Sequence, residues 1–279
     1  MRSFVRRSGE APRIPWIGGD VALLAAGDET GDRYTVEIAA SGEGGGPAPH
    51  LQAREDEFFF VLSGGPITYT AGNQAVDVSA GGFITISSGT AHQFKNNGRA
   101  GRLITFNAPA GFDRFQRQVM APWVEKGEAP PPMPELGKRI AEVAPSFGIT
   151  MFPDEALFEV PPVVHSVAGD APADELAAGV NVTVLAEAKH TGGRYAVARA
   201  RLSAGALPRV IGHRIAATGL IVLEGKARFT LGGLDHVLEP EDFAHIEPGD
   251  DASIGPADAG DTSVLVWHAP ALGVPFSSL

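Results

Sequence analysis

Short apolar runs separated by glycine-rich turns fill most of the first 108 residues of the chain. The runs cover residues 21–25, 34–39, 58–62, 83–86 and 103–106. Runs of this length between Gly and Asn clusters are typical of the strands of a β-sandwich or β-barrel. The same texture returns later, in residues 180–185, 195–202, 220–223, 227–231 and 264–268. The pattern therefore predicts two β-rich regions.

A stretch with helical spacing lies between the two β-rich regions. Apolar residues recur at this spacing in residues 112–125 and again in residues 135–144, with the proline-rich spacer APPPMPE between them. The chain of 279 residues suits two domains, at about 150 residues each. We therefore expect an N-terminal domain over residues 1–111, a helical connector over 112–150 and a C-terminal domain over 151–279.

The two halves of the chain share landmarks at a nearly constant offset. Gly64 ends the run FFFVLSG, and Gly225 ends the run LIVLEG 161 residues later. Gly89 in ISSGTAH and Gly249 in IEPGDDA are 160 residues apart. Self-similarity at a fixed offset indicates a duplicated domain.

The composition excludes several classes of partner. The net charge of −11 opposes binding to a phosphate backbone or an anionic membrane surface, so we expect neither nucleic acid nor membrane as a partner. The N-terminal residues do not resemble a secretory signal, and we expect a cytoplasmic protein. Because the chain has no cysteine, any metal ligand must come from His, carboxylate, amide or water.

Two segments resemble the two sequence motifs of the cupin superfamily. Residues 44–64 read GGGPAPHLQAREDEFFFVLSG, and residues 81–96 read GGFITISSGTAHQFKN. The matching positions are Gly44, His50, Glu57 and Gly64 in the first motif and Gly81, Gly89, His92 and Asn96 in the second. Gln52 stands where the family has its second histidine, and Ser87 replaces a proline. The resemblance implies an all-β fold of two cupin jelly-roll β-barrels (a bicupin), joined by the short helical connector.

The spacing of these residues suits a metal site inside the first barrel. His50 and Gln52 share a face because residues two apart on a strand point the same way. Glu57 lies past a turn on the next strand, and His92 comes from a third strand. Two imidazoles and a carboxylate then form a 2-His-1-carboxylate site with open positions. Gln52 is either a weak fourth ligand or a residue that hydrogen-bonds a bound ligand.

The expected surroundings of the site are apolar. Strand alternation places Phe59 and Val61 on the same face as Glu57, and Phe94 on the same face as His92. An aromatic-lined cavity suits a planar or hydrophobic organic substrate. The alternative is a barrel that has lost its metal, in which the His and Glu side chains are ordinary polar groups of the core.

The segment HLQAREDEFFFVLSG and the later PAGFDRFQRQV resemble bacterial quercetin 2,3-dioxygenase-like cupins. Those proteins typically have HLH where this chain has HLQ, and they use a divalent metal to help dioxygen cleave a flavonol or related enol. The resemblance implies that His50, Glu57 and His92 are ligands of one divalent metal ion here. The ligand types leave Fe, Mn, Ni, Co, Cu and Zn open.

The second barrel has glycines at most of the motif positions that hold glycine in the first barrel but lacks the residues that would bind a metal. At the offset of the repeat, Ile211, Thr218 and Ala252 stand at the positions of His50, Glu57 and His92. His213, at the position of Gln52, is the single imidazole left at these four positions, and we interpret it as structural or as a contact of a substrate. We expect the second barrel to stabilise the first barrel or to cover its pocket.

Three functions are consistent with these residues. The preferred one is a metal-dependent oxygenase, a quercetinase-like dioxygenase that acts on a flavonol or another enolisable aromatic molecule, with dioxygen as partner and Glu57 as catalytic proton acceptor. The second is a non-redox metal-dependent isomerase, cyclase or lyase, and the third is a cupin that binds a ligand without catalysis. Family habit also implies a homodimer.

Overall fold

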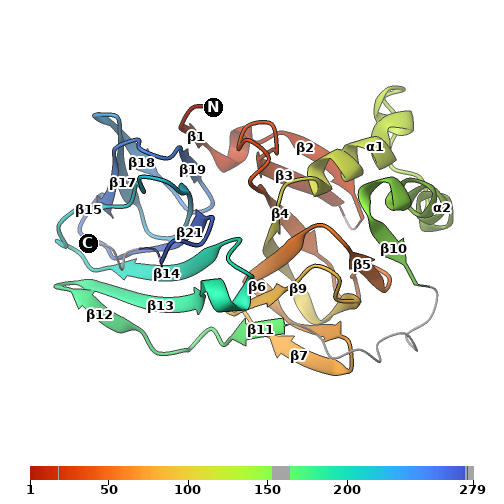
Figure 1. Ribbon diagram of the computed structural model, residues 1–279, viewed down its shortest axis with the longest axis horizontal. Coiled ribbons are helices and arrows are strands. Elements are labelled where there is room, and N and C mark those ends of the chain that lie inside the picture. Colours follow the sequence, from red (N-terminus) through yellow and green to blue (C-terminus); the bar gives the residue numbers. More distant parts are fainter. Residues whose placement is uncertain (18, 153–163, 274, 276–279) are drawn as a thin grey trace. The chain divides into compact units, whose positions relative to one another are not determined.

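The computed structural model describes residues 1–17, 19–152, 164–273 and 275 (Figure 1). The chain divides into two compact units. Residues 12–170 form one, here called the N-terminal unit, and residues 1–11 together with 171–279 form the C-terminal unit. Both are built mainly of antiparallel strands, as the alternating apolar pattern predicts, and each is described separately below.

The N-terminal unit contains a ten-stranded sheet. The strands of its main path, in spatial order, are β11 (Val164–Val167), β8 (Phe83–Ile86), β6 (Asp56–Ala71), β9 (His92–Ala108), β4 (Thr35–Ser41), β3 (Gly19–Ala25) and β2 (Arg13–Trp16). Off this path, β5 (His50–Gln52) pairs with β9 and with β10 (Ile149–Met151), and β7 (Gln74–Val78) pairs with β6.

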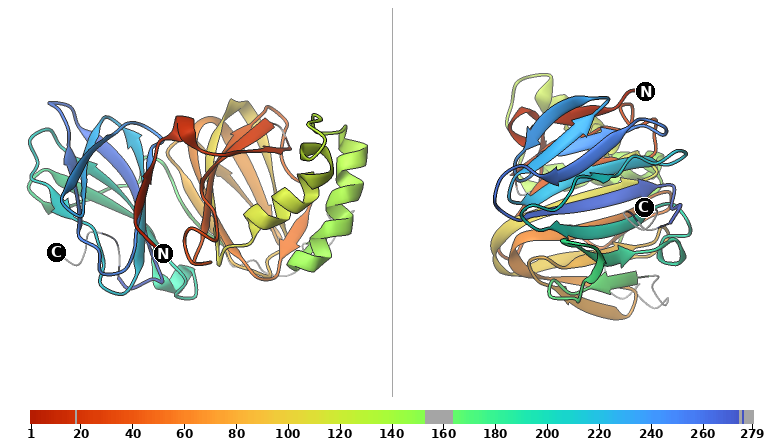
Figure 2. Two further views of the ribbon diagram at one scale, coloured as in Figure 1. Left: turned by 90° about the horizontal axis from the view of Figure 1, so that it is seen from above. Right: turned by 90° about the vertical axis from the view of Figure 1, so that its left-hand side faces the viewer.

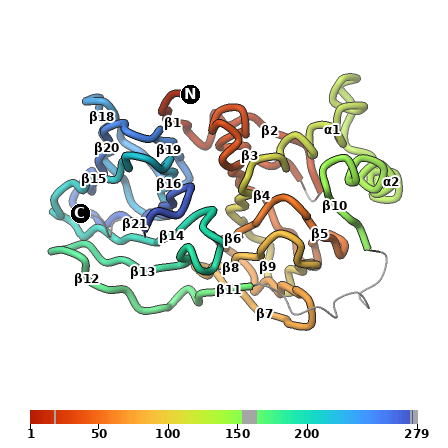
Figure 3. Tube along the Cα trace, viewed as in Figure 1, coloured from red at the N-terminus to blue at the C-terminus, as the bar shows by residue number. Residues whose placement is uncertain are grey.

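The C-terminal unit has two sheets (Figure 3). Residues of both sheets form one apolar core. The seven-stranded sheet runs β1 (Phe4–Arg6), β19 (Phe243–Ile246), β16 (Ala217–Glu224), β21 (Thr262–Ala269), β14 (Ala196–Leu202), β13 (Val180–Ala186) and β12 (Asp174–Ala177). The four-stranded sheet runs β15 (Arg209–Val210), β20 (Ala252–Pro256), β17 (Ala227–Leu231) and β18 (Leu234–Leu238). Two short 3₁₀ helices also occur in this unit, at Ser8–Glu10 and Ala188–His190.

The expected strands are present, but two of them are much longer than the apolar runs. β6 spans 16 residues and β9 spans 17 residues. The ladder between them continues through Gly64 and Gly65, where the register shifts, so these glycines form a bulge and not the end of a strand. Gly64 has φ +76°, and a Cβ there would lie 2.6 Å from the carbonyl oxygen of Arg99. The close approach of β9 therefore requires glycine at this position.

The expected helical connector is a structural layer of the N-terminal unit. It consists of α1 (Phe112–Val124), α2 (Met133–Val143) and a 3₁₀ turn at Ala144–Phe147. Their apolar faces form a core of their own with Phe115, Val119 and Ile140, and Ile149 of β10 joins it. Figure 2 shows the two helices side by side at one end of the unit. Neither helix is long and apolar enough to cross a membrane, among the residues that the structure describes.

The ends of the two units depart from the expected limits at residues 111 and 151. Phe4 of β1 pairs with His245 of β19, so the first residues complete the C-terminal sheet. Val164 of β11 pairs with Ile86 of β8, so this later segment completes the N-terminal sheet. Both strands cover a sheet edge, where backbone groups otherwise lack partners. These strands pair with partners far away in the sequence, and the pattern of apolar runs along the chain does not indicate which strands will pair.

Candidate metal centre

Three buried side chains from three strands converge in the N-terminal unit. His50 lies on β5, Glu57 on β6 and His92 at the start of β9. His50 and His92 pair across their strands, with ring centroids 4.4 Å apart. One potential ligand atom from each residue lies within 4.8 Å of the others. The structure therefore brings together the three residues that the motif spacing predicted.

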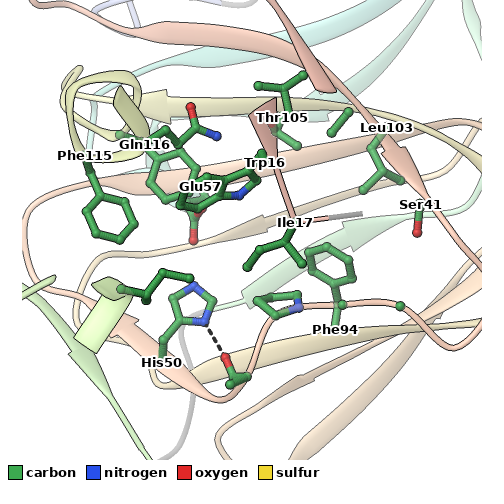
Figure 4. A pocket seen from close by; sticks show the side chains of 18 of the residues that line it. Trp16, Ile17, Ser41, His50, Glu57, Phe94, Leu103, Thr105, Phe115 and Gln116 are labelled. Atoms are coloured by element: carbon green, nitrogen blue, oxygen red, sulfur yellow. Dashed lines mark hydrogen bonds between the residues drawn. The ribbon is translucent and has the colours of Figure 1, made fainter. Parts of the chain in front are cut away.

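Backbone carbonyls fix the tautomer of both histidines. Nδ1 of His50 lies 3.0 Å from the carbonyl oxygen of Ala48, the contact drawn as a dashed line in Figure 4. Nδ1 of His92 lies 2.8 Å from the carbonyl oxygen of Thr90. Since a carbonyl oxygen only accepts, each Nδ1 carries the proton and donates it. Nε2 is therefore the atom left for a metal, as in many metal-binding histidines.

Glu57 is held as a carboxylate by its neighbours. Its Oε2 lies 2.8 Å from Nε2 of His92, and its Oε1 accepts a hydrogen bond of 3.0 Å from Nδ2 of Asn107. Burial alone raises the pKa of Glu57, but His92, His50 and Asn107 outweigh it and bring the pKa below its usual value. Burial also lowers the pKa of His50, to about 4. A neutral imidazole and a carboxylate are thus present at neutral pH, as a divalent ion requires.

A cavity of about 530 Å³ opens onto His50 and Glu57 (Figure 4). Its wall is largely apolar and includes Phe59 and Phe94, as expected. Val61 is not part of the wall: it is fully buried in the apolar cluster beneath, with Phe59. A volume of this size holds a small organic molecule.

Comparison with known proteins supports the motif reading. Residues 35–106 match the cupin domain family. Quercetin 2,3-dioxygenase of Bacillus subtilis (strain 168) is 25% identical over 289 residues, which cover 98% of this chain and 84% of the relative. A solved variant of oxalate decarboxylase from Bacillus subtilis has a TM-score of 0.64 at 12% identity, over 97% of this chain and 78% of that one. A variant of salicylate 1,2-dioxygenase from Pseudoaminobacter salicylatoxidans has a TM-score of 0.55 at 16% identity, over 85% and 70% of the two chains.

Residues 35–106 of this chain form a cupin domain, and nearly the whole chain has a fold similar to that of the solved oxalate decarboxylase. The expected fold class is thereby confirmed, with the helices as an added layer of the first unit. The expected cofactor, one divalent metal ion, has its three expected ligands together in the His-Glu-His cluster. The expected homodimer and the cytoplasmic location stay predictions.

Gln52 lies two residues from His50 on β5 and is buried. Its backbone carbonyl accepts from the N–H of Gly89, but neither its Oε1 nor its Nε2 has a hydrogen-bond partner among the described residues. A buried amide without hydrogen bonds lowers the stability of the fold, so we expect a bound group to pair with the side chain of Gln52. The cluster itself thus supplies two imidazoles and one carboxylate, and Gln52, two residues from His50 on β5, carries a buried amide without a partner among the described residues.

The helices and the first strands supply cavity residues that sequence reasoning missed. Trp16 of β2 and Phe112, Phe115 and Gln116 of α1 line the cavity. The Trp16 ring meets the ring of Phe115 edge-on, with centroids 5.8 Å apart. The sequence does indicate that residues 112–125 pack against another element, because their apolar face must be covered. The interpretation of this segment as a connector assigned no surface for that face to pack on.

The two acidic residues directly before Glu57 are buried in spite of their charge. Glu55 and Asp56 have 4% and 3% of their surface exposed. Asp56 begins β6, and its Oδ1 accepts the backbone N–H of Ser88 at 2.7 Å. Burial, followed by the charge of Glu57, raises the pKa of Glu55 to about 7. The strand β6 therefore begins at Asp56, earlier than the polar composition of this segment indicates.

The corresponding positions of the C-terminal unit are packed differently. Ile211, Thr218 and Ala252 are all buried, and Thr218 donates its hydroxyl to the carbonyl of Ile211 at 3.2 Å. Nδ1 of His213 accepts the backbone N–H groups of Ile215 and Ala216 at 3.2 and 3.1 Å. An accepting Nδ1 leaves the proton of the neutral ring on Nε2, the reverse of the tautomer at His50. This arrangement supports a structural role for His213.

Proposed function

We propose that this cupin is a quercetinase-like dioxygenase that cleaves a flavonol or another enolisable aromatic molecule. A metal-dependent cupin enzyme is what the relatives support, and the substrate and the use of dioxygen are the proposal. The observation that carries it is the opening of the apolar cavity directly onto His50 and Glu57. His50, Glu57 and His92 would hold the metal, and Gln52 would act as a weak ligand or bind the ligand of the metal.

A divalent ion at these residues supplies a Lewis acid with open positions for substrate and dioxygen. The chain supplies the rest. Phe59 and Phe94 contact the flat faces of an aromatic substrate and exclude water from the cavity. Glu57, held in orientation by Asn107, accepts the proton of the substrate hydroxyl on the oxygen that faces His92.

The second candidate is a non-redox reaction at the same metal, in an isomerase, cyclase or lyase. The specific observation in its favour is Gln52, because an amide donates more weakly to a metal than the imidazole it replaces. Loss of the metal would leave the third candidate, a cupin that binds its ligand without catalysis.

The test combines metal analysis with oxygen uptake. Protein purified without chelator, and reloaded in turn with Fe, Mn, Ni, Co, Cu and Zn, is assayed with quercetin in an oxygen electrode. Glu57→Ala is expected to lose uptake, whereas Glu128→Ala, at an exposed position, is expected to keep it. Turnover of the substrate without oxygen would favour the non-redox reaction, and absence of turnover with every metal would overturn the enzyme proposal.

A further inference from the structure

A second polar group lies on the wall of the same cavity, beyond the residues proposed to hold the metal. Glu37 of β4, Thr105 of β9 and Gln116 of α1 all line the cavity. Glu37 and Gln116 are almost fully buried, with 1% and 0% exposed. In the view of Figure 4, Gln116 and Thr105 lie on the far side of Glu57 from His50. The cavity therefore has a polar end separate from the metal centre.

The strand register sets the separation between the two polar groups. Glu57 of β6 pairs with Asn107 of β9, and Glu37 of β4 pairs with Thr105, two residues earlier on β9. The central strand β9 separates β6 from β4, so the backbones of β6 and β4 lie about 10 Å apart, two strand spacings. A molecule with two ring systems has the length to reach from one of these strands to the other.

The hydrogen bonds of Glu37 leave two atoms free for such a ligand. Oε2 of Glu37 accepts from Nε2 of Gln116 at 3.1 Å and from the hydroxyl of Thr105 at 3.5 Å. Oε1 of Glu37 and Oε1 of Gln116 have no hydrogen-bond partner in the part of the chain that the structure describes. Buried polar atoms without partners are rare because they lose the hydrogen bonds they make with water.

The protonation of Glu37 determines what the free atoms offer. Burial raises the pKa of Glu37 to about 8; the hydrogen bond from Gln116 opposes the rise and Asp113 adds to it. The neutral acid has one carbonyl oxygen and one hydroxyl oxygen. Since Oε2 accepts two hydrogen bonds, it is the carbonyl oxygen, and Oε1 carries the proton. A ligand in the cavity thus meets a hydrogen-bond donor at Oε1 of Glu37 and an acceptor at Oε1 of Gln116.

We propose that Glu37 and Gln116 bind a phenolic hydroxyl group of the substrate, on a ring other than the one that meets the metal. A hydroxyl both accepts and donates, so it satisfies both free atoms at once. An anionic group would instead face the lone pairs of the Gln116 amide and the nearby charge of Asp113. The proposal rests on the proposed function for the substrate class, and it adds which part of that substrate is recognised.

The experiment compares two flavonols that share the enol but differ in their other hydroxyls. Quercetin carries hydroxyls on the outer rings, and 3-hydroxyflavone has none there. Their Kd values are measured without oxygen, on zinc-loaded and on metal-free protein, by quenching of tryptophan fluorescence, since Trp16 lines the cavity. Wild type is expected to prefer quercetin about tenfold, the ratio that one or two net hydrogen bonds provide.

Variants assign the preference to the two residues. Glu37→Leu and Gln116→Leu are each expected to reduce the preference for quercetin by several-fold and to leave the Kd for 3-hydroxyflavone nearly unchanged. Glu37→Gln keeps a donor at the same place and is expected to retain most of the preference. Gln118→Leu, on the exposed side of α1, is the matched control and is expected to behave as wild type. Thermal melting of each variant shows whether it is folded.

The outcomes separate this proposal from the proposed function. Equal binding of both flavonols by wild type, no binding of either, or a preference that survives Glu37→Leu and Gln116→Leu would overturn the subsite. A preference that these variants remove supports the subsite even where oxygen uptake is absent, in which case the oxygenase proposal alone fails. Oxygen uptake with equal binding of both flavonols would support the oxygenase and reject the subsite.

Discussion

Nε2 of His92 lies 2.8 Å from Oε2 of Glu57, so two proposed metal ligands share a proton in the metal-free chain. A metal must replace this proton, and its binding therefore releases it. Because the two side chains already face each other, little rearrangement is needed to bring both onto one ion. The same pairing explains why the pKa of His92 is raised despite its burial, which alone would lower it.

Removal of one of these ligands is expected to abolish stoichiometric metal binding. Elemental analysis of wild type should give about one metal ion per chain, and His92→Ala and His50→Ala should each lose at least tenfold in affinity. His213→Ala is the matched control in the C-terminal unit, since Nδ1 of His213 accepts two backbone N–H groups. An equal loss of metal in His213→Ala would contradict the assignment.

Gln52→Leu is expected to change stability and metal affinity in opposite directions. The buried amide has no hydrogen-bond partner among the described residues, so its removal should stabilise the metal-free protein by about 1–3 kcal/mol. If the amide binds the metal, the same change lowers metal affinity. Urea unfolding of the metal-free protein and a metal titration measure the two effects. A variant that is less stable and binds metal as before would show that Gln52 serves packing alone.

The motif residues could be predicted because their positions are set locally. His50, Glu57 and His92 follow from strand alternation and the turns between three neighbouring strands. Glu37 gives a weaker signal, a charged residue inside the apolar run TVEIAA, and one such residue does not by itself indicate a binding site. Gln116 reaches the cavity because α1 packs over the sheet, and no pattern within residues 112–125 names the surface that a helix will cover.

Glu37→Gln is expected to make the stability of the protein less dependent on pH. The pKa of Glu37 is raised from 4.5 to about 8 in the folded state, mainly by burial. A raised pKa means that the folded state binds the proton more tightly than the unfolded state. Protonation of Glu37 therefore contributes fully to the free energy of unfolding below pH 4.5, and this contribution is lost as the pH rises to about 8. The loss amounts to about 1.4 kcal/mol for each unit of pH in this window.

Urea unfolding from pH 4.5 to pH 8.5 measures this effect as the difference between variant and wild type. The difference removes the contributions of Glu55 and the His-Glu-His cluster, which both proteins share. The variant should gain stability relative to wild type as the pH rises, and the gain should level off above about pH 8. A difference that stays constant over this range would show that Glu37 is ionised in the folded protein.

Deletion of residues 1–7 is expected to destabilise the C-terminal unit while leaving the metal centre intact. β1 covers the edge of β19, the ring of Phe4 lies 5.7 Å from that of Phe243, and Arg7 forms an ion pair of 2.6 Å with Asp242. The deletion exposes the backbone groups of β19 and part of the Phe243 ring, which favours unfolding and edge-to-edge association.

Thermal melting and light scattering measure the two consequences, and metal content reports on the N-terminal unit. Phe4→Ala is the milder variant: it keeps the strand and removes the ring, and we expect it to cost about 1–2 kcal/mol. Arg2→Ala, at an exposed position of the same segment, is the matched control and should melt as wild type. Unchanged melting in the deletion variant would show that β1 adds nothing to the C-terminal sheet, and the first residues would then be a tail rather than its edge strand.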